Sequence, residues 1–243
     1  MRDLHTEGTF EIVPPDNGPP FIKSRGIRFP NDRRVIPPRR RKALRLGQYE
    51  DRETQAVTAT VKPDDVVVEL GAGMGYMSTL MAKNLNVAQV HAYEANPDMV
   101  PYIQAVYDEN GVENAQVHNA ILGPKKGKVN FYVRGNFLAS SMEENPRGLK
   151  GKPTRVEKIE MRNINAEFKR LKPTVLVCDI EGAEADILPT ADLSCLRAAI
   201  VELHPQWIRQ KGVQAVFDAM HKAGLTYYPK RSDAKVVTFL KGW

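Results

Sequence analysis

The stretch from Val66 to Gly75 restricts the fold of this chain more than any other part of the sequence, because a strand pattern passes directly into a glycine-rich turn. It opens with consecutive valines, and such β-branched residues are typical of a short strand buried inside a sheet. Gly71, Gly73 and Gly75 follow, and glycine lets the backbone approach a ligand and adopt dihedrals that a Cβ forbids. Ligands of open α/β sheets bind just beyond the carboxyl ends of the strands. The stretch therefore predicts a buried strand, a ligand-binding turn and a helix.

From residue 64 onward, strand and helix patterns alternate along the chain. Strands are expected at 65–70, 89–94, 115–119, 174–179 and 197–203, and helices at 49–60, 76–85, 98–109, 183–188 and 207–223. Such alternation predicts parallel βαβ units and a doubly wound, mostly parallel sheet of the Rossmann-like α/β class. Residues 225–228 and 235–240 close the chain as an antiparallel hairpin, which gives the main sheet seven strands. Residues 121–162 break the rhythm with two short antiparallel strands, so we treat them as an insertion.

The N-terminal residues differ in composition from the rest of the chain. Residues 1–47 hold 11 Lys and Arg against 5 Asp and Glu, so they carry the whole net charge of +6. They are also rich in proline, which disfavours long helices. We expect a basic arm over residues 1–45 and a compact domain over 46–243. A basic arm is typical of contact with an anionic partner, although a solvated arm folded over its own domain explains the same pattern.

Composition places the chain among ordinary globular proteins. It is 42% hydrophobic and 26% charged, and it has no apolar run near the roughly 20 residues that span a bilayer. No secretory signal is recognisable at the N-terminus, so we predict a cytoplasmic protein without a transmembrane segment. Cys178 and Cys195 lack the spacing of a metal site and are interpreted as buried free thiols.

Acidic residues beside the glycine turn indicate which ligand it binds. The third glycine falls one position earlier than in the dinucleotide fingerprint G-x-G-x-x-G, and Glu69 before the turn would repel a pyrophosphate. An acid there suits a cationic ligand, and S-adenosylmethionine carries both an ammonium and a sulfonium group. Glu94, at the end of the next strand, can accept hydrogen bonds from ribose hydroxyls. We therefore predict an S-adenosylmethionine site formed by Glu69, Gly71, Ala72, Gly73, Gly75, Tyr76, Glu94, Ala95, Asn119, Ala120 and Asp179.

Three carboxylates follow the strand that ends near Asp179, at positions 179, 181 and 184. They allow three interpretations that the sequence leaves open. Asp179 and Glu181 can hold a divalent cation such as Mg²⁺, either can act as a general base with a pKa raised by burial, or the group only caps and shapes the loop. His204, after the strand over 197–203, is a further candidate for the base because its ordinary pKa lies near neutrality. The predicted catalytic residues are therefore Asp179, Glu181 and His204.

Several of these segments together resemble a known family. Glu69-Leu-Gly-Ala-Gly-Met-Gly75 looks like motif I of the class I S-adenosylmethionine-dependent methyltransferases, and Asp179-Ile-Glu-Gly-Ala-Glu184 resembles the D-x-E-G-x-E segment of the FkbM family. Further matching pieces occur in the family's order: Gly47-Gln-Tyr-Glu50 with Glu53, then Ser140-Ser141, then Glu202-Leu-His204. The resemblance covers residues 46–205 and implies methyl transfer to a hydroxyl oxygen of a sugar, polyketide or similar small molecule. It suggests Tyr49, Glu53, Ser140, Ser141 and Glu202 as residues near the acceptor, with the 121–162 insertion on the acceptor side.

Two other functions remain as alternatives. The basic arm is compatible with a nucleic-acid methyltransferase, although enzymes that methylate base amino groups usually carry a proline-proline-aromatic tetrapeptide where this chain has Asp179-Ile-Glu-Gly182. We therefore expect a small-molecule or glycan acceptor and regard nucleic acid as an unfavoured partner. A protein that binds S-adenosylmethionine without catalysis is the third possibility, and the presence of Asp179, Glu181 and His204 together argues against it.

Overall fold

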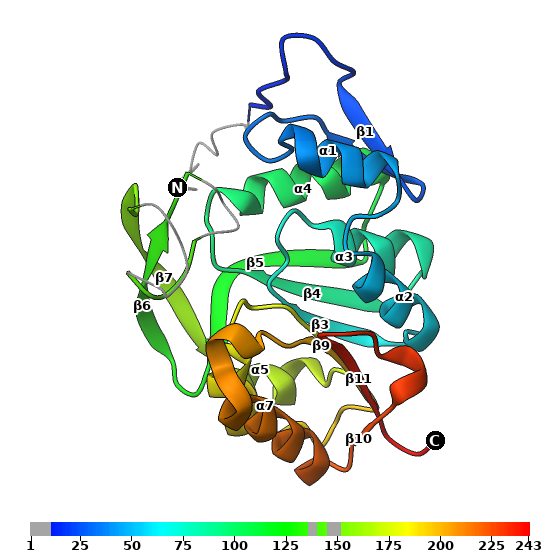
Figure 1. Cartoon of the computed structure of the whole chain (residues 1–243), viewed down its shortest axis with the longest axis vertical. Coiled ribbons are helices and arrows are strands. Elements are labelled where there is room, and N and C mark those ends of the chain that lie inside the picture. The colour runs from blue at the N-terminus through cyan, green and yellow to red at the C-terminus, as the bar shows by residue number, and fades with distance from the viewer. Residues whose placement is uncertain (1–10, 136–139, 145–151) are drawn as a thin grey trace, which may run out of the picture.

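The computed structural model describes residues 11–135, 140–144 and 152–243, and it is built around one large sheet (Figure 1). The strand order in the sheet is β10-β11-β9-β8-β3-β4-β5-β7-β6. Its strands are β3 (Val66–Leu70), β4 (Gln89–Glu94), β5 (Ala115–Gly123), β6 (Gly127–Val133), β7 (Arg155–Asn163), β8 (Val175–Cys178), β9 (Ala198–Glu202), β10 (Thr226–Tyr227) and β11 (Val236–Leu240). Neighbouring strands from β9 to β7 run parallel, whereas β10, β11 and β6 pair antiparallel to their neighbours. The predicted doubly wound α/β class is confirmed.

Helices cover both faces of this sheet (Figure 1). One apolar core contains side chains of the helices α1 (Pro38–Arg45), α2 (Asp51–Thr60), α3 (Tyr76–Thr79) and α4 (Met99–Asn110). The second core, on the other face, contains those of α5 (Ile164–Leu171), α6 (Glu184–Ile187) and α7 (Pro205–Lys222). The inner strands are buried on both faces, which explains why their sequences read as continuous apolar runs rather than alternating ones.

The sheet has nine strands in the described residues, whereas the sequence predicted seven. Strand β5 was expected to end at residue 119, but it continues to Gly123 and pairs through its last residues with β7. Strand β6 then pairs antiparallel with β7 along seven residue pairs. Much of the segment interpreted as an insertion is therefore the edge of the main sheet. The continuation of β5 has backbone N–H and C=O groups that can pair, and β7 forms hydrogen bonds with them.

The expected N-terminal arm is packed on the domain over part of its length. Strands β1 (Phe21–Ser24) and β2 (Ile27–Pro30) form an antiparallel hairpin. Ile22, Ile27 and Phe29 are buried in the same core as α3 and α4, and the Tyr102 hydroxyl donates to the Pro30 carbonyl at 2.8 Å. Residues 1–10 lie outside the described part, and the boundary at residue 46 stays a prediction.

None of the helices in the described segments combines the length and the apolar character that crossing a bilayer requires.

Candidate functional site

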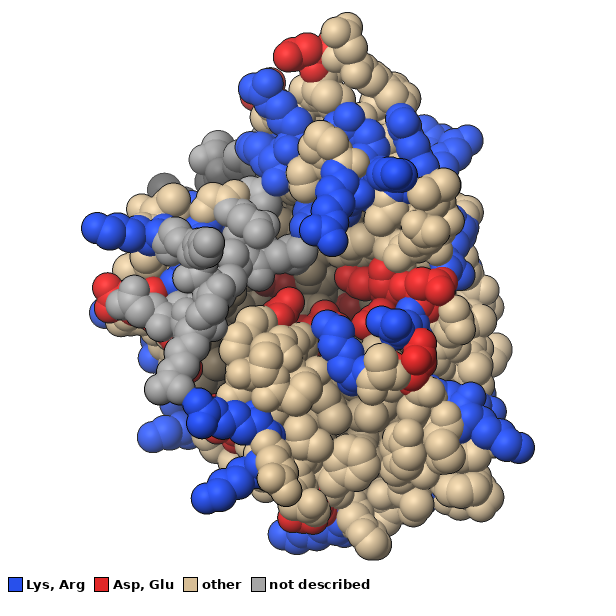
Figure 2. Space-filling view, in the orientation of Figure 1, with Lys and Arg blue, Asp and Glu red and all other residues tan. Residues whose placement is uncertain are grey.

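A cavity of about 300 Å³ opens at the carboxyl ends of β3, β4, β5 and β8, as expected for a ligand site in an open α/β sheet. Figure 2 shows a hollow near the middle of the view in which acidic side chains gather. The four strand ends, the residues just before α2, and parts of α4, β6 and α6 contribute to its lining. The lining residues are Tyr49, Glu50, Leu70, Gly71, Gly73, Tyr93, Glu94, Ala95, Met99, Ala120, Ile121, Leu122, Phe131, Met142, Asp179, Ile180, Glu181, Ala183 and Ile187.

The glycine turn lets the backbone form one wall of this cavity. Gly71, Gly73 and Gly75 all have positive φ, at +85°, +56° and +74°. A Cβ added to Gly71 would lie 1.8 Å from the carbonyl oxygen of Asp179, so no other residue fits where β3 passes β8. A Cβ on Gly73 would meet nothing within 4 Å, because that residue faces the open cavity. The turn is thus tight on one side and vacant on the ligand side.

Glu94 links the glycine turn to the end of β4. Its carboxylate accepts hydrogen bonds from the backbone N–H of Gly73 at 2.8 Å and of Asn96 at 2.7 Å. Burial raises the pKa of Glu94 to about 7, although these backbone donors act in the opposite direction. The carboxylate still has lone pairs for ribose hydroxyls, since a carboxylate accepts about four hydrogen bonds.

Glu69 lies in a narrow recess of about 30 Å³ that shares Glu50, Gly71 and Asp179 with the main cavity. Its side chain is buried, and its Oε2 atom has no hydrogen-bond partner among the described residues. Burial raises the pKa of Glu69 to about 8, and the nearby charge of Glu50 acts in the same direction. A buried acceptor without a partner is costly, and a cationic ligand group would satisfy it. The site therefore fits S-adenosylmethionine.

Five predicted cofactor residues do not line the main cavity: Glu69, Ala72, Gly75, Tyr76 and Asn119. Tyr76 is buried in the core, where its ring stacks on Phe29 at a centroid distance of 5.7 Å. The amide of Asn119 donates to the backbone carbonyls of Glu94 and Ala95, so it braces the end of β4. Gly75 and Ala72 also lie outside the main cavity, although Ala72 lines the recess that holds Glu69. Glu69, Gly71, Gly73, Glu94, Ala95, Ala120 and Asp179 are brought together around the main cavity and the recess, and their contact with the cofactor stays a prediction.

The sequence did not reveal the apolar wall of the cavity. Met99, Ile121, Leu122, Phe131 and Ile187 line it, and they are the side chains suited to a flat aromatic base. In the sequence they look like core residues, because an apolar residue at a strand end has the same pattern whether it faces a ligand or a helix. Glu50 was also missed as a lining residue, and burial raises its pKa to about 8.

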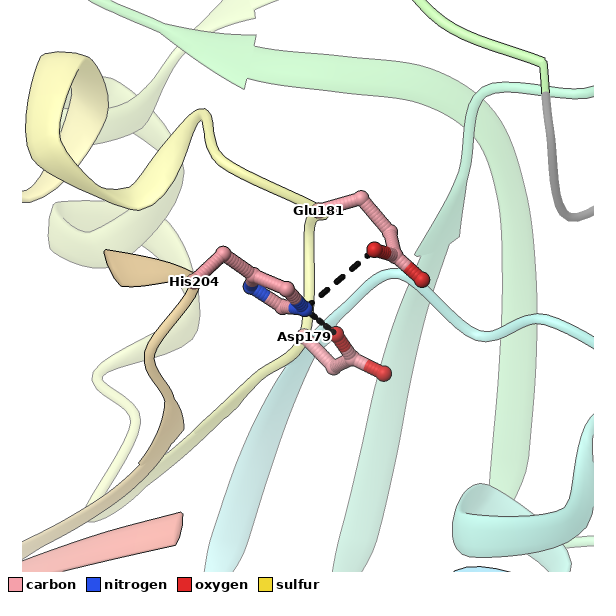
Figure 3. Close-up of side chains that lie close together, drawn as sticks. All are labelled: Asp179, Glu181 and His204. Atoms are coloured by element: carbon pink, nitrogen blue, oxygen red, sulfur yellow. Dashed lines mark ion pairs between the residues drawn. The ribbon is translucent and has the colours of Figure 1, made fainter. Parts of the chain in front are cut away.

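His204 stands at the centre of the acidic group that the sequence singled out (Figure 3). Its Nε2 atom lies 3.2 Å from Glu181 Oε2 and 3.6 Å from Asp179 Oδ1, while its Nδ1 atom lies 3.3 Å from Glu184 Oε1. The ring is buried and stacks on Trp207 at 5.2 Å. Burial by itself would lower the pKa of His204, but the contacts with Glu181 and Glu184 outweigh it and raise the pKa to about 10.

Glu184 connects the loop after β8 to the backbone and side chain of His204. Its carboxylate accepts from the backbone N–H of Gly182 and of His204, both at 2.8 Å, and its side chain is fully buried. Its pKa is lowered, because the hydrogen bonds from His204 and the backbone outweigh the effect of burial. Burial, followed by the charge of Glu181, raises the pKa of Asp179 to about 7.

The predicted acceptor-side residues do not gather in one place: four of them are spread over three cavities, and Ser140 lines none of these. Tyr49 lines the main cavity, while Glu53 and Glu202 line the recess, where Glu202 also forms an ion pair with Lys235. Ser141 lines a second cavity, and Ser140 instead accepts a hydrogen bond from the backbone of Arg134 at 3.0 Å.

The second cavity, of about 750 Å³, adjoins the first and shares Met142, Glu181 and Ala183 with it. Residues at the start of α7, among them Gln206, Trp207 and Arg209, line its far side. Glu181 thus lies at the junction of two cavities and Asp179 lines the first of them, an arrangement that suits transfer between two ligands.

Comparison with known proteins agrees with this geometry. Residues 66–227 match the model of the methyltransferase FkbM domain. A tRNA wybutosine-synthesizing protein 2 homolog of Danio rerio is 32% identical over 134 residues, which cover 51% of this chain and 31% of that protein. A ribosomal RNA small subunit methyltransferase A of Rubrobacter xylanophilus is 35% identical over 79 residues, or 31% of this chain and 29% of that protein. The matches therefore span about a third of the length of these curated relatives.

Among solved structures, M. jannaschii TYW2 in complex with AdoMet superposes with a TM-score of 0.50 at 14% identity, covering 91% of this chain and 86% of that chain. This likeness supports the fold. The family match spans most of the chain and includes every strand of the cofactor cavity. The chain belongs to the FkbM methyltransferase family, within the class I S-adenosylmethionine-dependent methyltransferases.

Proposed function

We propose that this chain transfers the methyl group of S-adenosylmethionine to a hydroxyl oxygen of a small molecule or sugar. The observation that carries the proposal is the position of Glu181 at the junction of the two cavities, two residues after Asp179, which lines the main cavity. The main cavity takes the adenosyl cofactor, and the second cavity takes the acceptor. A cytoplasmic location belongs to the same proposal.

The proposed reaction is an in-line displacement at the methyl carbon. An acceptor oxygen forms a bond to that carbon, the carbon–sulfur bond breaks, and its electron pair returns to sulfur to give S-adenosylhomocysteine. The acceptor proton passes to the Asp179 carboxylate and then to water. Most of the rate comes from holding oxygen, carbon and sulfur in line, because positioning removes a large part of the entropic barrier. Proton removal contributes a further factor of about 10²–10⁴.

RNA is the second candidate acceptor, because one surface near the hollow is strongly basic. Lys and Arg side chains gather above the acidic hollow in Figure 2, over the region of α1. Arg39, Lys42 and Arg45 are exposed on α1 and form no ion pair within the described residues. The two curated relatives named above are, by their names, concerned with tRNA and ribosomal RNA.

An acceptor panel separates these two functions. Transfer of a labelled methyl group from S-adenosylmethionine would be measured on hydroxylated small molecules, oligosaccharides and total RNA. We expect label in the first two classes, and no effect of the triple charge reversal Arg39→Glu, Lys42→Glu and Arg45→Glu. A different result would favour RNA as the acceptor. In that case RNA would be labelled by the parent chain but not by the triple variant, and binding of RNA would weaken steeply as the salt concentration rises.

The variant Glu69→Gln should bind the cofactor more weakly and yet be more stable at high pH. Folded Glu69 keeps its proton up to a pKa of about 8, against 4.5 as the ordinary value. Its contribution to stability is therefore full below the ordinary value and is lost as pH rises through 8. Glutamine does not ionise, so the variant should unfold at a higher denaturant concentration at about pH 9 and at a similar one near pH 4–5.

The same change should lower the affinity for S-adenosylmethionine by about 10- to 100-fold, because a hydrogen bond to a charged group contributes about 1.5–3 kcal/mol. Denaturant midpoints at the two pH values and calorimetric titration with the cofactor measure both effects. Glu113→Gln, an exposed residue far from the cavity in sequence and fold, serves as the matched control. Unchanged affinity in Glu69→Gln would show that Glu69 does not face the cofactor's cationic group.

A further inference from the structure

We propose that Asp179, Glu181 and His204 bind a divalent transition-metal ion, and that Mn²⁺ binds there more tightly than Mg²⁺. The three residues offer two carboxylate oxygens and one imidazole nitrogen, and these atoms lie within 4.8 Å of one another. The part that such an ion plays in catalysis rests on the proposed methyl transfer, whereas binding of the ion does not.

The distances suit a metal site. Metal–ligand bonds of about 2.0–2.2 Å place neighbouring ligand atoms roughly 3–3.5 Å apart. His204 Nε2 lies 3.2 Å from Glu181 Oε2 and 3.6 Å from Asp179 Oδ1. In Figure 3 both carboxylates point toward this one nitrogen, from the loop that follows β8. Small movements of these side chains would therefore place the three atoms around one ion.

Glu184 orients the histidine as a metal ligand. Metal-bound histidines usually donate their other ring N–H to a carboxylate, which fixes the tautomer and the ring plane. Nδ1 of His204 lies 3.3 Å from Glu184 Oε1, and Glu184 is itself fixed by two backbone N–H groups. A bound ion would displace the proton from Nε2, and with the other proton kept on Nδ1 by Glu184 the Nε2 lone pair would face Asp179 and Glu181. Glu184 is thus a positioning residue for the proposed site.

Two further features point to a ligand at this position. The Oδ1 atom of Asp179 is buried and has no hydrogen-bond partner among the described residues, although it faces the histidine. Glu181 has a positive φ of +50°, a backbone conformation that non-glycine residues seldom adopt. Such strain persists where the surrounding structure imposes it and is concentrated at functional sites. Glu202 is not a member of this three-residue group, and its carboxylate is paired with Lys235.

The ligand set decides which ion is favoured. Carboxylates suit Mg²⁺ and Mn²⁺ equally, but an imidazole ligand favours the transition metals over Mg²⁺. Three protein ligands leave coordination positions open for water or an acceptor hydroxyl, as in catalytic metal sites. An ion there lowers the pKa of a hydroxyl bound to it. Because Asp179 Oδ1 faces the ion, its Oδ2 atom remains to accept the acceptor proton.

Binding of Mn²⁺ alone tests the proposal without any acceptor. The full chain, freed of metals with a chelator, would be titrated with Mn²⁺ while the electron paramagnetic resonance signal of free Mn²⁺ is recorded. We expect one ion bound per chain, and at least about 10-fold weaker binding of Mg²⁺ in competition. Glu181→Gln is the first variant, because this half-exposed side chain can be changed without opening the core. Glu181→Gln should lower the affinity for Mn²⁺ by at least about 10-fold, and His204→Ala should have the same effect.

Glu184→Gln should lower the affinity for Mn²⁺ by about 10- to 100-fold. If Glu184 had only a structural role, a Glu184→Gln variant that still binds S-adenosylmethionine would bind Mn²⁺ with unchanged affinity. Asp218→Asn, an exposed carboxylate on α7, is the control and should bind Mn²⁺ as the parent chain does. No bound Mn²⁺, or binding that survives both Glu181→Gln and His204→Ala, overturns the proposal. Methyl transfer at the full rate after the metal has been removed with a chelator would show that the ion has no part in catalysis. The proposed methyl transfer itself would then still stand.

Discussion

Replacing Gly71 with alanine is expected to destabilise the chain by about 2–5 kcal/mol and to abolish cofactor binding. The new Cβ would lie 1.8 Å from the Asp179 carbonyl oxygen, and the residue has a φ of +85°. Overpacking costs about 1–3 kcal/mol, and the left-handed conformation adds about 1–2 kcal/mol for a residue with a Cβ. The two strands would have to separate at their carboxyl ends, where the cavity begins. Denaturant unfolding and calorimetric titration with S-adenosylmethionine measure the two effects.

Two other glycines separate the steric effect from the backbone effect. Gly111 has a φ of +62° and nothing within 4 Å of an added Cβ, so Gly111→Ala should cost only the backbone term of about 1–2 kcal/mol. Gly73→Ala should cost a similar amount of stability, because its Cβ would enter open space. That space belongs to the cavity, and an extra methyl group in a binding pocket costs roughly 10- to 200-fold in affinity. A Gly71→Ala chain as stable as Gly111→Ala would contradict the packing described for β3 and β8.

Replacing Asp179 with asparagine is expected to reduce methyl transfer by about 10²–10⁴-fold, the usual contribution of a positioned proton acceptor. Asparagine has nearly the same size, so the fold and the cavity should be retained. The carboxylate that takes the acceptor proton would be lost, and S-adenosylmethionine should still bind with an affinity that changes far less. Single-turnover transfer of labelled methyl and calorimetric titration with the cofactor measure the two quantities separately.

Asp218→Asn provides the control for this change, because it removes one exposed carboxylate on α7 away from both cavities. Its transfer rate should match that of the parent chain. If Asp179→Asn transferred methyl at the parent rate, the proton would have another acceptor and the role given to Asp179 would be wrong. If it lost the cofactor as well as transfer, Asp179 would serve binding rather than proton removal.

The cofactor side of the site could be predicted from residues close together in the sequence. Val66 to Gly75 determines a strand, a tight turn and a helix by local chemistry, since β-branching and missing Cβ atoms act where they occur. Glu69 and Glu94 could be assigned to one site because the carboxyl ends of neighbouring parallel strands meet at the same edge. Asp179 followed from the same rule. The fold class and the family were therefore accessible from the sequence alone.

Contacts between distant segments were decided only by the tertiary structure. Tyr76 follows the glycine turn directly and was expected to touch the cofactor, but packing against Phe29 turns it into the core. His204 and Glu184 lie 20 residues apart, and only the packing of β9 beside β8 brings the ring between three carboxylates. The apolar cavity wall and the two extra sheet strands have the same cause. A hydrophobic pattern states that a side chain is buried, whereas the tertiary arrangement decides whether it is buried against protein or against a ligand.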